Sequence, residues 1–315
     1  MFARHDRTPT FTSVQEYGSR LEDVGFWWPY VAETLRRHGL TDARRQPVAG
    51  FNATYPTFLY GDVVVKLFGY LRPWRESHAA ERAALALVAT DPEIAAPCLL
   101  GEGRLYDDDD ERWPYLVTTR MPGIAWQEAE PSTEQRRSVA AQLGRQVRRV
   151  HALRPSGVAT ESDWPAMNVA AAAEHSSLPP HLIVQIDDYL ARLGPFDRVF
   201  VHGDLVAMHA FVESGRLTGI IDWGDAMVTD RHYELIQLYR DMFGCDKALF
   251  RVFLGASDWP VGKDFPRRAL GLALYRQAVG LAQHPTIDVF EPIAALLPLQ
   301  DIGTLDELAT ELFAV

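Results

Sequence analysis

The spacing of apolar residues changes along the chain and predicts two kinds of structure in turn. Between residues 20 and 40 apolar side chains recur at near-helical intervals, and Gly39 offers a stop, so we expect a leading helix there. From about residue 45 to 121 short apolar runs alternate with turn signals, which is typical of a small, mostly antiparallel sheet with one inserted helix. The expected strands are residues 46–50, 54–60, 63–68, 100–106 and 115–121.

Helical spacing dominates from residue 132 onward. Ser132 and Thr133 resemble a helix cap, and the apolar positions after them predict a long helix that ends near Leu153. Three short β-like runs interrupt the helices, at residues 198–202, 209–212 and 217–222. The change of texture near residues 121–131 divides the chain into a sheet-rich first lobe (1–121) with the leading helix and a larger helical second lobe (122–315). The expected fold class is therefore α+β.

Composition and charge narrow the class of protein. Of 315 residues 47% are hydrophobic and only two are cysteines, so we expect a soluble chain that folds without disulfides in a reducing cytoplasm. No signal-peptide core and no apolar run of ~20 residues is found, so no membrane segment is expected. The net charge of −11 argues against a nucleic-acid partner and would steer a cationic small molecule toward the protein. Taken alone, such a charge is more simply explained by solubility.

A lysine and a glutamate occupy positions where apolar residues are expected. Lys66 lies within the apolar run VVVKLF, and a buried ammonium group is costly unless it is paired. Glu81 shares a helical stripe with Ala84 and Val88, so its carboxylate also points toward the apolar side. Each supplies the partner that the other needs, and kinases use a strand lysine held by a helix glutamate to bind nucleotide phosphates. The alternative is a Lys66 that reaches solvent and a Glu81 on the surface.

The two short runs around residue 215 predict a β-hairpin. Residues 213–216 are turn-like, so residue 212 should face residue 217 and His209 should lie opposite about residue 220. Diagonal neighbours across such a pair lie within about 8 Å, which brings His209 close to Asp222 and would let the two share one metal ion. Asp204 precedes the hairpin in a glycine-bearing loop, where its carboxylate can reach a substrate hydroxyl at the same site.

These residue types suit phosphoryl transfer, which depends mainly on positioning and on neutralising charge. The reaction needs a base at the attacking oxygen, for which Asp204 is the candidate. It also needs ligands for a magnesium ion that bridges the phosphates, for which His209 and Asp222 are the candidates. The tripeptide HGD alone often marks only a turn. Its combination with Lys66, with Glu81 and with a strand that ends at position 222, in this order, is specific.

With this combination the sequence resembles the aminoglycoside phosphotransferase family over nearly its whole length. The family has a bilobal, protein-kinase-like fold, and its pattern is HGDLxxxN followed by a strand that ends in IDW or IDF. The resemblance implies ATP or GTP as the donor, Mg²⁺, and transfer of the γ-phosphoryl group to a hydroxyl of a polycationic antibiotic. Within the family the chain is most similar to enzymes that modify the 7''-hydroxyl of hygromycin B, in segments such as VVVKLFG, WPYLVTTRMPGIAW, FVHGDL and LTGIIDWGDAMVTDRHYELIQLY.

The family pattern implies a role for each matching residue. It makes Asp204 the catalytic base, Asp222 a metal ligand, and Lys66 the phosphate-binding lysine with Glu81 as its partner. The nucleotide loop would be residues 50–54, and the strand that leaves the first lobe would offer backbone hydrogen bonds to the purine. The expected nucleotide contacts besides the Lys–Glu pair are Gly50, Asn52, Thr54, Thr119, Arg120 and Met121.

Position 209 departs from this pattern, because the family most often has asparagine there. Asparagine offers a carbonyl oxygen, which suits Mg²⁺, whereas the imidazole of His209 is a softer ligand that would also admit Mn²⁺. In one interpretation His209 is a working ligand, as in macrolide phosphotransferases, which are more distantly similar. In the other, the protein is a pseudokinase that binds nucleotide or antibiotic without catalysis. The other site residues are all present, which favours the active enzyme.

Acidic and aromatic residues of the second lobe are candidates for binding the acceptor. The carboxylates of Asp225, Glu234 and Asp241 could hold ammonium groups, and Trp164 and Trp259 could stack on sugar rings. Asp225 could equally brace the loop after Asp222, and each candidate alone is more often a surface residue. Further acidic candidates are Glu174, Asp187 and Asp188.

Three other polar residues suggest structural roles. His202, the first residue of the HGD motif, is expected to hold the catalytic loop by hydrogen bonds. His151 should cap the C-terminal end of its helix, and Asp230 should cap the N-terminal end of the next.

The prediction is therefore a cytoplasmic small-molecule kinase that phosphorylates an aminoglycoside-type antibiotic, with hygromycin-like compounds as the first expected substrates. The alternatives are a kinase for a macrolide, a sugar or an amino alcohol, and a catalytically silent binding protein. We expect ATP or GTP and Mg²⁺ as cofactors, a cationic antibiotic as the partner, no nucleic-acid or membrane partner, and a monomer or a homodimer.

Overall fold

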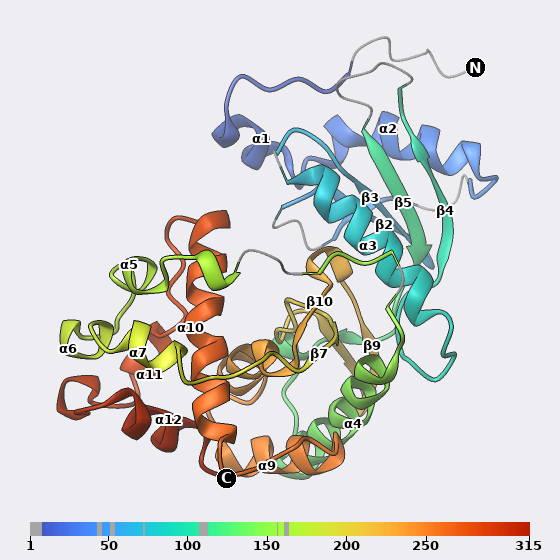
Figure 1. The fold of residues 1–315 in the computed structure, drawn as a ribbon. Helices are drawn as coiled ribbons and strands as arrows, with labels where there is room; N and C mark the ends of the chain where they lie inside the picture. The colour runs from blue at the N-terminus through green and yellow to red at the C-terminus, as the bar shows by residue number, and fades with distance from the viewer. Residues whose placement is uncertain are drawn as a thin grey trace.

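The structure, a computed structural model, describes residues 8–42, 46–50, 54–71, 73–106, 113–155, 157–160 and 164–315. A sheet flanked by helices forms the N-terminal part, and helices make up most of the larger C-terminal part (Figure 1). Among the described residues no helix is long and apolar enough to cross a membrane.

A five-stranded antiparallel sheet forms the N-terminal part. Its strands are β1 (Val48–Ala49), β2 (Thr57–Tyr60), β3 (Val63–Leu67), β4 (Leu99–Arg104) and β5 (Pro114–Thr119), in the spatial order β1-β2-β3-β5-β4. All five predicted strands form, with shifted ends. β3 is the middle strand and pairs with both β2 and β5, so that Lys66 lies opposite Thr57 on one side and Leu116 on the other.

Helices cover both faces of this sheet. A short helix, α1 (Val14–Arg20), precedes α2 (Val24–Arg37), which is the predicted leading helix and ends before Gly39 at a φ of 67°. Trp27 of α2 belongs to a buried cluster with Val65 and Val117 of the sheet. The inserted helix α3 (Trp74–Val88) lies against the other face, since its residue Leu85 belongs to a second cluster.

The C-terminal part begins with the long predicted helix α4 (Thr133–Ala152). Ser132 and Gln135 form a capping box, in which each side chain accepts a hydrogen bond from the other's backbone N–H. α4 packs along α9 (Lys247–Ala256), and Gly144 permits the close approach, because a Cβ there would lie 2.5 Å from the carbonyl oxygen of Phe253.

Two small sheets lie between these helices and the N-terminal sheet. The predicted hairpin is β8 (Ala210–Glu213) and β9 (Arg216–Ile220), joined by β6 (Ile124–Ala125). Val212 faces Leu217 as predicted, but a bulge at Phe211 shifts the rest, so that Ala210 rather than His209 faces Ile220. β7 (Arg198–Val201) pairs with β10 (Met227–Asp230), a strand too short and too polar to be predicted from the sequence.

The remaining elements are helical. A bundle formed by α10 and several short helices lies on the far side of the C-terminal part from α4 (Figure 1). The full set of remaining helical elements, inside and outside this bundle, is η1 (Trp126–Glu128), η2 (Trp164–Ala166), α5 (Val169–Ala173), α6 (Pro180–Ile183), α7 (Ile186–Leu190), η3 (Trp223–Asp225), η4 (Arg231–Glu234), α8 (Leu235–Gln237), the π-helix η5 (Leu238–Met242), α10 (Phe265–Gln283), α11 (Glu291–Ala294), η6 (Leu299–Asp301) and α12 (Leu305–Phe313).

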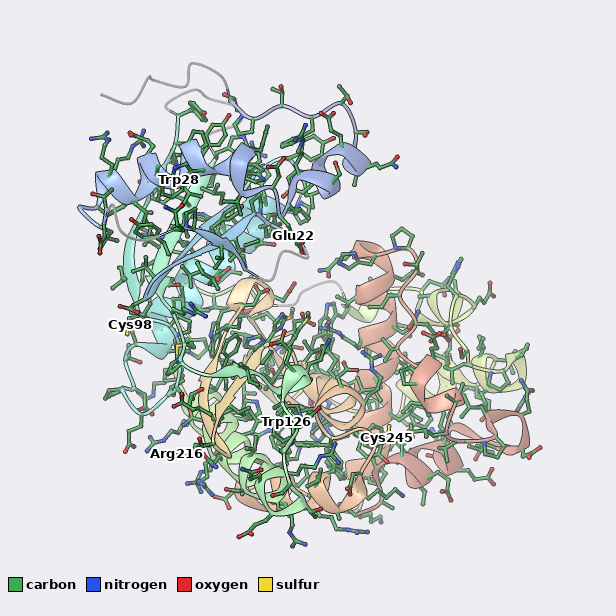
Figure 2. The ribbon with its side chains drawn as sticks, turned by 180° about the vertical axis from the view of Figure 1, so that it is seen from behind. Glu22, Trp28, Cys98, Trp126, Arg216 and Cys245 are labelled. Atoms are coloured by element: carbon green, nitrogen blue, oxygen red, sulfur yellow. The ribbon has the colours of Figure 1, made fainter. Side chains whose placement is uncertain are left out.

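Buried apolar side chains form two clusters. One lies between α2 and the N-terminal sheet. The other starts at α3, includes Leu116 of β5, and continues through α4, β7 and α10. Because the second cluster spans residue 121, the division of the chain at that residue stays a prediction. The two cysteines are free and lie in different parts of the molecule, Cys98 exposed beside the sheet and Cys245 in the helical part (Figure 2).

Candidate active site

Lys66 and Glu81 form the predicted ion pair. The Lys66 Nζ donates to Glu81 Oε2 at 2.7 Å, because the side chain leaves the face of β3 that α3 covers. The same Nζ also donates to Asp222 Oδ1 at 2.7 Å. Burial disfavours the ammonium charge, but the carboxylates of Asp222 and Glu81 outweigh it and raise the pKa of Lys66. The lysine therefore remains charged and links β3 to the loop that follows β9.

Asp222 has an unusual backbone. Its φ of 63° and ψ of 66° are left-handed, a region that aspartate tolerates better than most residues, and η3 begins directly after it. Burial opposes the charge of this carboxylate, yet Lys66 and then His209 lower the pKa of Asp222 well below its ordinary value. Asp222 therefore offers a carboxylate to the cleft across the working pH range.

The HGD loop follows β7 and depends on its glycine. Gly203 has a φ of 85°, and a Cβ at this position would lie 1.9 Å from the carbonyl oxygen of Asp225. The buried His202 holds the loop as expected: its Nε2 donates to the carbonyl of Ile221 at 2.9 Å, and its Nδ1 accepts the N–H of Asp204 at 3.2 Å. This pair of bonds requires a neutral ring, and burial lowers the pKa of His202 accordingly.

Glu234 braces the same loop instead of facing an acceptor, so the expectation that it binds an ammonium group is wrong. Its carboxylate is 1% exposed, and Oε1 accepts the backbone N–H groups of His202 and Gly203 at 2.8 and 3.2 Å. His151 Nε2 lies 3.2 Å from its other oxygen. His151 is thus buried against Glu234 and is not a simple helix cap.

His209 lies between the two aspartates, as the hairpin predicts. Its Nδ1 donates to the backbone carbonyl of Asp204 at 2.8 Å, and its Nε2 lies 3.5 Å from Asp222 Oδ2. A carbonyl can only accept, so the hydrogen of a neutral ring is on Nδ1 and the Nε2 lone pair faces the carboxylate oxygen. Two acceptors that face each other need a cation or a proton between them, and the pair therefore fits a metal ion.

The carboxylate of Asp204 is held by two residues that the sequence analysis did not identify. Arg276 of α10 donates from Nη2 to Oδ1 at 2.8 Å, and Gln237 of α8 donates from Nε2 to the same oxygen at 2.7 Å. Burial disfavours the charge, but Arg276, His209 and the hydrogen bond from Gln237 together outweigh it, and the pKa of Asp204 lies below its ordinary value. Arg276 could have been found by the argument used for Lys66, since it is a charged residue in the middle of an apolar helix.

The other residues predicted to bind the acceptor differ in their burial and in their contacts. Asp225 is partly buried beside the HGD loop, and burial and then Asp204 raise its pKa. Both oxygens of Asp241 accept hydrogen bonds from the neighbouring Arg240. Trp164 and Trp259 are buried among other rings, so the expectation that they stack on sugars is wrong.

A cleft of about 360 Å³ contains all but one of the predicted nucleotide residues that the structure describes. Its lining includes Lys66, Glu81, Gly50, His209 and Asp222, together with the segment that leaves β5. Gly50 pairs its N–H with the carbonyl of Thr57, whereas Thr54 contacts Tyr17 and is not part of the lining. Asn52 lies outside the described residues.

Of the three residues predicted to contact the purine, two use their backbone N–H groups within the protein. The N–H of Thr119 donates to Cys98 and that of Arg120 to Asp62, at 2.9 and 2.8 Å. In the described part of the chain no residue accepts from the N–H of Met121, which lines the cleft. Of the three, only Met121 therefore has a backbone N–H that is left for a ligand in the described part of the chain.

Comparisons with known proteins agree with this geometry. Residues 50–265, most of the chain, match the phosphotransferase enzyme family. The structure is similar to that of a GDP complex of wild-type aminoglycoside 2'-phosphotransferase-IIIa, with a TM-score of 0.62 and 19% identity over 90% of this chain and 98% of that one.

Two further structures share the fold at low identity. The aminoglycoside phosphotransferase APH(3'')-Id from Streptomyces rimosus, in complex with ADP and streptomycin, has a TM-score of 0.55 and 20% identity over 79% of this chain and 98% of that one. The macrolide 2'-phosphotransferase MphH from Brachybacterium faecium has a TM-score of 0.56 and 21% identity over 90% of this chain and 97% of that one. The expected protein-kinase-like α+β fold is confirmed, and the chain belongs to the phosphotransferase enzyme family.

Proposed function

We propose that this phosphotransferase moves the γ-phosphoryl group of ATP or GTP to a hydroxyl group of a cationic aminoglycoside-type antibiotic and thereby inactivates it. The observation that supports this most is the convergence of a paired lysine, two aspartates and a histidine on one cleft: Lys66 Nζ lies 2.7 Å from Asp222, and His209 lies between Asp222 and Asp204.

The donor nucleotide would occupy the cleft with its purine against the segment after β5. Met121 would donate its N–H to the base, and apolar residues such as Leu85 and Leu116 would contact its faces. Lys66, held by Glu81, would bind the phosphates as a fixed positive charge. GDP and ADP are bound in the related structures named above, which supports a purine nucleotide but does not separate ATP from GTP.

The transfer step needs a base for the acceptor hydroxyl. As the hydroxyl oxygen forms its bond to the γ-phosphorus, the bond from that phosphorus to the β–γ bridging oxygen breaks, and the nucleoside diphosphate leaves with the electron pair. The hydroxyl proton passes to the carboxylate of Asp204, which is charged because Arg276, His209 and Gln237 together keep its pKa low against the effect of burial.

Asp222 and His209 would hold the metal ion. The lone pair of His209 Nε2 and the Oδ2 of Asp222 face each other at 3.5 Å, which suits one shared cation. No cluster of three or more His, Cys, Asp or Glu ligands occurs in the described part of the chain, so phosphate oxygens and water would complete the coordination. A bound Mg²⁺ would neutralise charge that develops on the phosphates, and Mn²⁺ would suit the imidazole as well.

The proposal that the acceptor is a cationic antibiotic is supported by the charge of the protein and by the ligands of similar proteins. The net charge of −11 would attract a polycation, and Asp225, a partly buried carboxylate beside Asp204, could bind one of its ammonium groups. Asp241 is a weaker candidate, since Arg240 already neutralises it. Streptomycin is bound in one related structure. A hygromycin-like aminoglycoside remains our first substrate proposal.

A coupled assay of nucleoside diphosphate release against a panel of antibiotics tests the proposal. Wild type should turn over with at least one aminoglycoside, and Asp204→Asn should lose at least about a hundredfold in kcat while ATP or GTP still raises its Tm. If nucleotide raises the Tm of the wild type but no acceptor supports turnover, the protein is a binding protein and not a kinase.

A macrolide is the second candidate acceptor, because His209 agrees with the macrolide phosphotransferases and one of them shares the fold. The dependence on salt separates the two classes. A polycation held by carboxylates should show a KM that rises with ionic strength, whereas a macrolide in an apolar pocket should show little change.

Three further expectations stay proposals. The two free cysteines suit a cytoplasmic location. The protein would act as a monomer or homodimer. Residues 1–121 would act as the nucleotide-binding lobe and residues 122–315 as the lobe for catalysis and acceptor binding.

A further inference from the structure

A buried arginine of the helical part contacts the catalytic loop at two points and η4 at a third. Arg276 Nη2 donates to Asp204 Oδ1 at 2.8 Å, and Nη1 donates to the Tyr233 hydroxyl at 2.9 Å and to the carbonyl of Gly203. Only 9% of Arg276 is exposed, and its guanidinium lies 4.9 Å from the centre of the Tyr233 ring. α10 thus reaches the loop from 72 residues away and fixes both its backbone and its carboxylate.

The two oxygens of Asp204 have different surroundings. Oδ1 accepts from both Arg276 and Gln237, which fills its two lone pairs. Oδ2 accepts no hydrogen bond from any described residue. Its near neighbour is His209 Nδ1 at 3.6 Å, and the hydrogen of that nitrogen already goes to the backbone carbonyl of Asp204. Oδ2 is therefore the oxygen that is left for a substrate.

Arg276 and Gln237 are not arranged to maximise stability. Arg276 Nε and Gln237 Oε1 are buried, and neither has a partner in the described part of the protein. Each such atom destabilises the fold, because it loses its hydrogen bonds to water on burial and gains none in return. Both residues that hold Asp204 contain such an unpaired buried atom, which indicates that they are placed for the function of the carboxylate and not for the stability of the fold.

We propose that Arg276 and Gln237 are positioning residues that hold Asp204 by Oδ1, so that Oδ2 is the oxygen that receives the proton of the acceptor hydroxyl. This inference rests on the proposed kinase function, because it assigns the base within that reaction. Without the two donors the carboxylate would rotate about its Cβ–Cγ bond, and Oδ2 would no longer face the attacking hydroxyl in most molecules.

The test compares variants of the full-length protein with the acceptor that supports wild-type turnover. Arg276→Met should lower kcat about a hundredfold, the cost of a displaced catalytic group, with the KM for nucleotide changed less than about twofold. Arg276→Lys should recover part of the loss. The control Arg267→Met removes an arginine of the same helix that pairs with Asp306 near the surface, and it should keep the wild-type kcat.

Two measurements separate positioning from a merely structural role. Guanidinium ion at low millimolar concentration should restore part of the kcat of Arg276→Ala in a saturable way and should not affect Asp204→Asn. The kcat of the double variant Arg276→Met with Gln237→Leu should be higher than the product of the two single effects predicts, because both residues act through one oxygen.

The outcomes are distinct. Wild type without turnover on any acceptor would overturn the kinase function and this inference with it. Wild-type turnover together with an undiminished kcat in Arg276→Met would overturn the inference alone. The inference alone would also be overturned if the Arg276 variants lost the nucleotide-induced Tm shift together with kcat and if guanidinium did not restore activity.

Discussion

Replacing His209 by asparagine tests the metal site most directly. The change removes the imidazole whose Nε2 lies 3.5 Å from Asp222 Oδ2 and whose Nδ1 donates to Asp204 at 2.8 Å. An amide can reproduce both functions, since its NH₂ donates and its oxygen binds a hard cation. Two neighbouring ligands of an octahedral Mg²⁺ with ~2.1 Å bonds lie about 3.0 Å apart, so the observed gap needs to close by only about 0.5 Å.

The magnitudes follow from these contacts. We expect His209→Asn to retain kcat/KM within about tenfold, or about 1.4 kcal/mol of transition-state energy. If the hydrogen bond to Asp204 is not fully replaced, the free energy of unfolding should fall by about 1 kcal/mol. The ratio of activity with Mn²⁺ to activity with Mg²⁺ should decrease, because an oxygen replaces a nitrogen ligand.

The assay is turnover with each divalent ion in parallel, together with urea unfolding. The control His209→Ala removes the ligand and should lose at least about a hundredfold in kcat, about 2.7 kcal/mol. A folded His209→Asn protein that still binds nucleotide but is inactive with every divalent ion would refute the idea that the two side chains are equivalent ligands.

Three other changes test the rest of the site. Lys66→Met should abolish measurable turnover and lower the free energy of unfolding by about 3 kcal/mol, because Glu81 is left buried without a cation, and the additional change Glu81→Gln should recover part of this in urea unfolding. Gly203→Ala should reduce both kcat and Tm, since its Cβ would lie 1.9 Å from the carbonyl oxygen of Asp225, whereas Gly262→Ala, with no atom within 4 Å, should leave both unchanged. Asp230 is fully buried, and although burial opposes its charge, the hydrogen bond from His232 lowers its pKa to about 2 from an ordinary 3.8. Its stabilising effect is complete above about pH 4 and is lost as the pH falls toward 2, so in urea unfolding between pH 5 and 2 the wild type should lose about 2 kcal/mol more than Asp230→Asn. Equal losses in the two proteins would show that this carboxylate is not the group that titrates.

The strands of the N-terminal sheet, the helices α2, α3 and α4, and the Lys66–Glu81 pair were accessible from the sequence. Each depends on local periodicity: alternation places Lys66 on one face of its strand, and helical spacing places Glu81 on the apolar stripe of α3. The position of His209 near Asp222 was also accessible, since the turn at residues 213–216 fixes the pairing. The bulge at Phe211 was not accessible, and it places Ala210 instead of His209 opposite Ile220. A bulge adds one residue to a strand, and in so short a strand this leaves no recognisable change in the alternation of apolar and polar residues.

The sequence did not show which acidic residues are buried and which are exposed. Glu234 has the sequence signature of a surface carboxylate, and only the docking of η4 against the end of β7 shows that it accepts two backbone N–H groups of the catalytic loop. Trp164 and Trp259 were misjudged for the same reason, because a tryptophan beside a predicted pocket and one in the core look alike in a sequence.

The sequence by itself therefore determined the chemistry that this protein can offer: a paired lysine, a base in a glycine loop, and a histidine and an aspartate that a hairpin brings together. Only the tertiary structure decided how the base is held. Arg276 and Gln237 lie 72 and 33 residues from Asp204, and they meet at one oxygen because α10 and α8 pack against the catalytic loop. Local spacing contains no record of such a contact, since it depends on where whole helices dock and not on the period of the residues within them.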